Sequence, residues 1–167
     1  SSAARYSPKS WPTEPTSTYG LSKLLGDVAI GHTRYSTAGS SVLVNAQPFL
    51  KDLRGVPLTV AHNGNLTNAP ELRRMLEEQG ALFDTTTDTE VLLHLYARST
   101  APTIEQALVE SISQAQGAFS LVLLTKDRLI AIRDPHGFRP LTLGRLGEAY
   151  VVSSETCALD LIDATWV

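Results

Sequence analysis

The order of hydrophobic and polar positions along this chain predicts short strands separated by amphipathic helices. Apolar runs of strand length occur at residues 27–32, 58–62, 118–125, 129–133, 141–144 and 149–153. Apolar positions spaced at helical intervals predict helices from the cap at Asn68 to Gly80, from residue 87 or 88 to about 98, from Thr103 to Gly117, and near 156–162. Helices grouped between hairpin-type strands are typical of an α+β fold with mostly antiparallel sheets.

Composition and charge exclude several classes of protein. The chain has 167 residues, of which 43% are hydrophobic and 19% are charged, which is enough for one globular domain with a real core. Its net charge of -3 is spread along the chain, so no basic face is available for nucleic acid. The apolar runs are too short to span a membrane. The single cysteine, Cys157, excludes an internal disulfide framework and a cysteine-rich metal cluster.

The first twenty residues differ from the rest of the chain. They hold three of the nine prolines and many Ser and Thr residues, without apolar periodicity. We therefore expect residues 1–20 to be a flexible lead-in and residues 21–167 to form the domain. A Ser-rich segment with Arg5 and Lys9 also has some transit-peptide character, but Glu14 and the prolines argue against the amphipathic helix of such peptides.

A polar loop after the first predicted strand carries groups that suit a small-molecule site. Arg34 lies beside the hydroxyls of Tyr35, Ser36 and Thr37, and a guanidinium binds a carboxylate through two parallel hydrogen bonds. An α-ammonium group needs a carboxylate partner, and Asp88 would supply one. Asp near a helix start is also a common N-cap, so a structural role for Asp88 stays open.

A second polar loop contains the dipeptide Asn63-Gly64. Gly64 permits a turn that presents backbone N–H groups, and the Asn63 amide adds a side-chain donor, an arrangement that suits an oxyanion. The alternative is a plain Asn-Gly turn that joins two strands. We expect His32 and His62, each at the end of an apolar run, to be structural histidines bonded to the backbone, because their spacing does not suggest metal ligands.

Six segments of the chain carry a family resemblance: GHTRYSTAG (31–39), NAQPF (45–49), AHNGNLTN (61–68), TDTE (87–90), RDPHGFRP (133–140) and SETCALD (154–160). They resemble the glutaminase domain of the class II glutamine amidotransferase family, and within it the branch of amidophosphoribosyltransferases. The resemblance runs from about residue 26 to the last residue. Sister families with the same glutaminase fold share the Arg, Asn-Gly and Asp elements, whereas the NAQPF, GNLTN and SETCALD stretches resemble the purine-synthesis branch.

The resemblance implies a fold and a set of site residues. The fold would be an αββα sandwich of the N-terminal-nucleophile hydrolase type, incomplete at both ends of this chain. Arg34 and Asp88 would bind the carboxylate and the ammonium of glutamine, with Thr37 adding a contact. Asn63 and Gly64 would form the oxyanion hole.

The family's nucleophile is a cysteine at the mature N-terminus, which this chain lacks. Cys157 matches another position of the family, where we expect a packed thiol, and Ser1 opens a segment that does not suit the centre of a sheet. We therefore expect a fragment without its first hairpin, inactive on its own. The alternative is a non-catalytic paralogue that keeps the glutamine pocket for binding or assembly.

The resemblance also implies partners outside the segment. Ammonia from glutamine would pass to a phosphoribosyltransferase domain that makes phosphoribosylamine from phosphoribosyl pyrophosphate, the first step of purine synthesis. That domain would use magnesium, the ligands of the family's iron–sulfur cluster would lie elsewhere, and no cofactor is expected in this segment. The full-length enzyme would be a homo-oligomer in the cytoplasm, or in a plastid if the lead-in is a remnant of a transit peptide.

Overall fold

The computed structural model describes residues 17–25, 28–35 and 43–167 of the chain. Its main element is an antiparallel sheet of four strands in the order β3-β4-β5-β6. The longest strand, β4, contains the Asn63-Gly64 dipeptide. The strands are β3 (Phe49–Leu53), β4 (Val56–Leu66), β5 (Gly117–Leu124) and β6 (Leu129–Arg133).

The sequence pattern predicted β4, β5 and β6 but missed β3. This strand is five residues long and carries polar Lys51 and Asp52 at its centre, so it lacks an apolar run. It forms a hairpin with β4 through Arg54 and Gly55, whose φ angles are +57° and +73°. Two positive φ angles in a two-residue loop match the twist of a hairpin.

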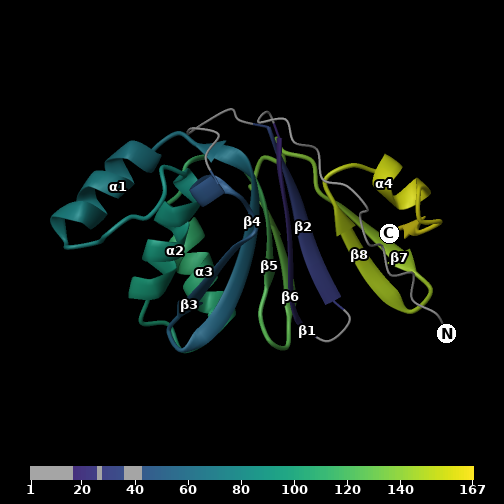
Figure 1. The fold of residues 1–167 in the computed structure, drawn as a ribbon, viewed down its shortest axis with the longest axis horizontal. Helices are drawn as coiled ribbons and strands as arrows, with labels where there is room; N and C mark the ends of the chain where they lie inside the picture. The colour runs from purple at the N-terminus through teal and green to yellow at the C-terminus, as the bar shows by residue number, and fades with distance from the viewer. Residues whose placement is uncertain (1–16, 26–27, 36–42) are drawn as a thin grey trace.

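The second and third of three helices cover one face of this sheet, and the first helix packs against the second (Figure 1). The apolar sides of the second and third helices meet the sheet in a core that includes Leu92 and Tyr96 from the second helix and Phe119 and Leu121 from β5. The third helix ends at Ile112 rather than at Gly117. The side chains of Ser113 and Gln114 donate hydrogen bonds to the carbonyl of Glu110, in place of the backbone N–H that would bond it in a continuing helix. The helices are α1 (Ala69–Glu78), α2 (Asp88–Arg98) and α3 (Ile104–Ile112).

A second layer of strands lies against the other face of the four-stranded sheet (Figure 1). The antiparallel pair β1 and β2 packs there, where Ile30 of β2 meets Ala61 of β4 and Leu124 of β5. A sheet in the order β8-β7-β9 and the short helix α4 lie beyond this pair, on the side away from the first three helices. The bounds are β1 (Ser17–Leu25), β2 (Val28–Tyr35), β7 (Thr142–Leu146), β8 (Ala149–Ser153), α4 (Cys157–Asp160) and β9 (Thr165–Trp166).

The order of layers confirms the expected α+β fold of the αββα type. Across Figure 1 the layers run from helices through two layers of antiparallel strands to α4. Residues 17–20, which we assigned to the lead-in, belong to β1, and residues 1–16 lie outside the described ranges. A 3-10 turn, Leu43–Asn45, leads into β3.

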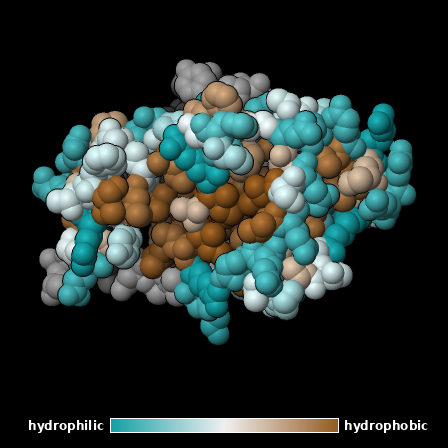
Figure 2. Space-filling view, turned by 180° about the vertical axis from the view of Figure 1, so that it is seen from behind, coloured by the Kyte–Doolittle hydropathy of each residue, from teal (hydrophilic) through white to brown (hydrophobic). Residues whose placement is uncertain are grey.

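Hydrophobic side chains gather over the middle of the face that is seen from behind in Figure 2. An apolar groove of about 390 Å³ lies between α3 and the β5–β6 hairpin, with Val109, Ile112, Ile130 and Ile132 among its walls. Val109 is 67% exposed, so the groove opens to solvent in the described part of the chain. None of the helices in the described ranges combines the length and the apolar character needed to cross a membrane.

Candidate functional site

Asp88 is the first residue of α2 and connects this helix to the end of β4. Its carboxylate oxygen Oδ2 accepts a hydrogen bond of 2.9 Å from the backbone N–H of Leu66. The other oxygen, Oδ1, lies 3.4 Å from Nδ1 of the His62 imidazole. The N-cap of the helix is Thr87, so the capping role that we left open for Asp88 is wrong. Asp88 is a helical residue whose side chain points back to the neighbouring strand.

The surroundings of Asp88 keep its carboxyl group ionised. Burial alone would raise the pKa, but the hydrogen bond and the charge of His62 and the N–H groups of Leu66 and Thr89 outweigh burial and hold the pKa of Asp88 below its ordinary value. The side chain still keeps 15% of its surface exposed. An ionised carboxylate that remains partly accessible suits a ligand ammonium group.

Asn63 and Gly64 lie inside β4 and do not form a turn. The register of β4 with β5 continues without a break from Thr59 opposite Leu124 to Leu66 opposite Gly117. Both versions of the turn expected from the dipeptide are therefore wrong, because pairing with β5 overrides the local preference of Asn-Gly. Gly64 serves close packing instead: a Cβ atom there would lie 2.2 Å from the carbonyl oxygen of Ala118.

Among the described strands, none pairs with one edge of β4 beyond Val60. The ladder with β3 ends at the pair Phe49 and Val60, and the backbone groups of alternate residues after that point face the open edge. On this edge the N–H of His62 donates to Oε1 of Gln47 at 2.7 Å, and the N–H of Leu66 donates to Asp88. By the same alternation the N–H of Gly64 faces this edge between them, where the described strands offer no acceptor.

The imidazole of His62 lies among side chains of α2 rather than against the backbone that we expected. Its Nδ1 atom is 3.0 Å from Oγ1 of Thr89, which also accepts a 3.3 Å bond from Nε2 of Gln47. The Nε2 atom of His62 is buried and has no hydrogen-bond partner in the described part of the chain. The amphipathic pattern missed Gln47, and only its place in the NAQPF segment singled it out.

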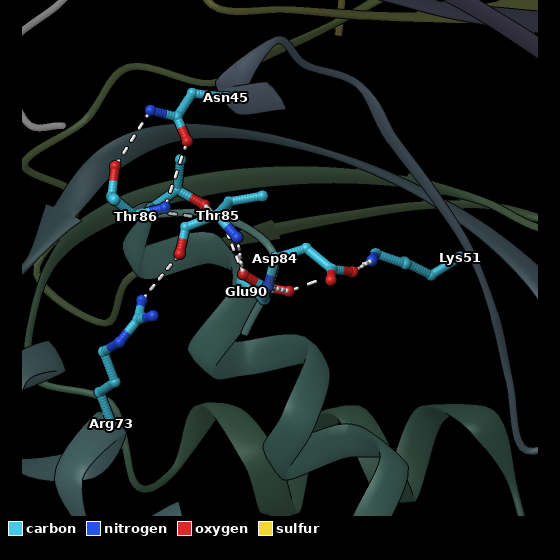
Figure 3. A network of polar contacts seen from close by, with 8 residues as sticks. Asn45, Lys51, Arg73, Asp84, Thr85, Thr86 and Glu90 are labelled. Atoms are coloured by element: carbon cyan, nitrogen blue, oxygen red, sulfur yellow. Dashed lines mark hydrogen bonds and ion pairs between the residues drawn. The ribbon is translucent and has the colours of Figure 1, made fainter. Parts of the chain in front are cut away.

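A network of polar contacts, buried around Glu90 and partly buried elsewhere, holds the loop before α2 (Figure 3). The carboxylate of Glu90 accepts hydrogen bonds of 3.0 and 2.7 Å from the N–H groups of Asp84 and Thr85. Asn45 bonds Thr86 twice, through its Nδ2 at 3.0 Å and through its Oδ1 at 3.2 Å. These bonds fix the loop that enters the helix, and so they fix the position of the helix start.

The remaining predicted site residues are placed less completely. Arg34 is in β2, opposite Thr18, on the strand pair that packs against β4 and β5, and its side chain is not among those the structure describes. Thr37 lies outside the described residues. Cys157 begins α4 and is exposed, so the expectation of a packed thiol is wrong; in this one-turn helix Leu159 takes the buried position, against Gly144.

Comparison with known proteins agrees with this arrangement. The model of a family described as "Glutamine amidotransferase domain" matches residues 32–161. The chain is 56% identical over 147 residues to Amidophosphoribosyltransferase 2, chloroplastic, of Arabidopsis thaliana, covering 87% of this chain and 26% of that protein. It is 47% identical over 148 residues to the Amidophosphoribosyltransferase of Bacillus subtilis, covering 88% of this chain and 31% of that protein.

Solved structures show the same likeness in three dimensions. The glutamine phosphoribosylpyrophosphate amidotransferase of B. subtilis, complexed with ADP and GMP, matches with a TM-score of 0.78 and 44% identity over 83% of this chain and 30% of that chain. A structure described as the allosteric regulatory enzyme of purine biosynthesis matches with a TM-score of 0.79 and 46% identity over the same shares. The chain thus spans about a third or less of the length of these relatives. It belongs to the glutamine amidotransferase domain family.

Proposed function

We propose that this domain hydrolyses the side-chain amide of glutamine as part of a longer amidophosphoribosyltransferase. The observation that carries the proposal is the open edge of β4, where the Gly64 N–H faces outward between a bonded His62 and the Asp88 contact at Leu66. A backbone donor without a strand acceptor, next to an ionised carboxylate, supplies one group for each end of the substrate.

Each group has a defined task in the proposed reaction. Asp88 binds the α-ammonium of glutamine, and Arg34, with Thr37 beside it, binds the α-carboxylate. The carbonyl oxygen of the side-chain amide then lies at the Gly64 N–H and the Asn63 amide, whose donors stabilise the negative charge that develops when a nucleophile attacks. Because the β4–β5 ladder holds the backbone of the strand, the Gly64 N–H needs no reorganisation during the reaction.

The nucleophile in this proposal is a cysteine thiol other than Cys157. That residue lies on α4, which Figure 1 places at the opposite end of the layers from α2. A thiol there does not reach the edge of β4. We propose that the nucleophile comes from a part of the longer protein that is not among these 167 residues.

The rest of the proposal concerns the longer protein. The relatives named amidophosphoribosyltransferase are three to four times as long as the matched segment, which leaves room for a second domain. We propose that ammonia released here passes to a magnesium-dependent phosphoribosyltransferase domain, in a homo-oligomer located in the cytoplasm or a plastid. The product would be phosphoribosylamine.

A labelling experiment with the full-length protein tests this function. Glutamine that carries ¹⁵N in its side-chain amide is supplied with phosphoribosyl pyrophosphate, and both glutamate formation and label in the product are followed. We expect wild-type protein to transfer the label and the Asp88→Asn variant to need far more glutamine. Glutamine binding without glutamate formation would support a non-catalytic paralogue and contradict the proposal.

A further inference from the structure

His62 is the point where three parts of the site meet. Its backbone lies on the open edge of β4 and donates to the Gln47 side chain at 2.7 Å. Its ring nitrogen Nδ1 lies 3.0 Å from Thr89 Oγ1 and 3.4 Å from Asp88 Oδ1, on the first turn of α2. Gln47, in the loop before β3, also donates to Thr89 at 3.3 Å. From its place on β4, His62 therefore contacts both the first turn of α2 and the loop before β3.

The imidazole also occupies the space beside Gly64. Residues two apart on a strand share one face, and a Cβ atom at Gly64 would lie 2.8 Å from the Nε2 atom of His62. A side chain at position 64 would therefore collide with the ring. The absence of that side chain lets the ring lie flush against the strand at the residue whose N–H we assign to the oxyanion.

The polar character of this ring is not explained by packing alone. The side chain of His62 is 1% exposed, yet Nε2 has no hydrogen-bond partner among the described residues. A buried polar atom without a partner opposes folding, and an apolar ring would fill the same space without that penalty. The polar group that the site uses is therefore Nδ1, which faces Asp88 and Thr89.

We propose that His62 is a positioning residue of the glutamine site, which holds the Asp88 carboxylate in place relative to the Gly64 edge of β4. The proposal rests on the function proposed above. His62 does not touch the substrate in this account, and it acts through Asp88. Because Asp88 binds the ammonium equally in the ground state and the transition state, loss of its positioning should raise the KM for glutamine more than it lowers kcat.

Two substitutions at His62 separate positioning from packing. The amide of Asn places a polar atom near the position of Nδ1, whereas Leu fills space without a polar atom. In the full-length protein we expect His62→Leu to raise the KM for glutamine by about 10- to 100-fold, and His62→Asn to raise it by less than about threefold. His94, six residues beyond Asp88 on the same helix, gives the matched control, and His94→Leu should leave this KM unchanged.

The outcomes distinguish this proposal from the proposed function. If wild-type protein forms no glutamate from glutamine, the function itself is wrong. If wild-type protein is active and His62→Leu keeps its KM, or if Asn and Leu raise the KM equally, the positioning role is refuted. Thermal unfolding of each variant shows whether it is folded. If His62→Leu does not fold, His62→Gln replaces it in the experiment. Its amide lies near the position of Nε2 and not of Nδ1, so this variant should raise the KM for glutamine as much as His62→Leu would.

Discussion

Gly64 offers the most quantitative prediction, because the space around it is fully defined. A Cβ atom at this position would lie 2.2 Å from the Ala118 carbonyl oxygen, 2.7 Å from Cα of Phe119 and 2.8 Å from Nε2 of His62. Two of these three atoms belong to the backbone of β5, so no change of side-chain rotamer relieves the contact. The strands β4 and β5 would have to move apart.

The cost of that movement follows from the structure. Non-bonded contacts of a Cβ atom below 3.0 Å are essentially unknown, so the shortest contact must lengthen by at least 0.8 Å, from 2.2 Å to 3.0 Å. Overpacking of this kind costs about 1–3 kcal/mol, and weakening the flanking hydrogen-bonded pairs at Asn63 and Asn65 adds about 1 kcal/mol each. We expect Gly64→Ala to lower the free energy of unfolding by about 3–5 kcal/mol.

Thermal unfolding of the full-length protein, followed by calorimetry, measures this effect. For a domain of this size the midpoint of the glutaminase-domain transition should fall by roughly 6–20 °C. Gly147→Ala is the control: nothing lies within 4 Å of its Cβ position, and the φ of +60° alone should cost about 1 kcal/mol. A Gly64→Ala variant that melts with the wild type would show that β4 and β5 do not approach as described.

Three further changes test other parts of the account. Asp88→Asn should raise the KM for glutamine in steady-state assays, and it should remove part of the protein's acid sensitivity. Folding lowers the pKa of Asp88 below its ordinary value of 3.8. The ionised carboxylate therefore stabilises the fold above pH 3.8, and this stabilisation is lost as the pH falls through the lowered pKa. Equal acid unfolding curves for variant and wild type would contradict this. Glu90→Leu leaves the N–H groups of Asp84 and Thr85 without their acceptor and should lower the free energy of unfolding by roughly 3 kcal/mol in urea titrations, whereas exposed Glu148→Leu should have little effect. Arg34→Lys should raise the KM for glutamine strongly while synthesis from added ammonia survives, and equal loss of both activities would refute its role.

Much of the fold could be predicted from the sequence because local patterns and tertiary packing agree there. The helix that begins at Asp88 carries apolar residues on its buried face, and β5 is apolar after its first glycine except at Ser120. The pattern misses β3 because this strand has only five residues and its centre is polar, so no apolar run marks it. A strand of this kind is defined by its neighbour rather than by its own residues.

The site is built from contacts between residues that are far apart in the sequence. The Asn63-Gly64 dipeptide predicts a turn, and only the register with β5 shows that it lies in a strand, whose other edge has no partner among the described strands. Asp88 was chosen for its charge, but its bond to Leu66 joins residues 22 positions apart. The role of Gln47 depends on two partners, His62 and Thr89, that are 15 and 42 positions away, so no local pattern could have revealed it.

Hydrogen exchange at the edge of β4 tests the central claim most directly. Glutamate, the product of the proposed hydrolysis, would occupy the site without being consumed. With saturating glutamate, the full-length protein should exchange the Gly64 amide more slowly, and the first turn of α2 should be protected with it, while the loop 134–139 stays unchanged. Unaltered exchange at Gly64 and Asp88 under saturating glutamate would contradict the account.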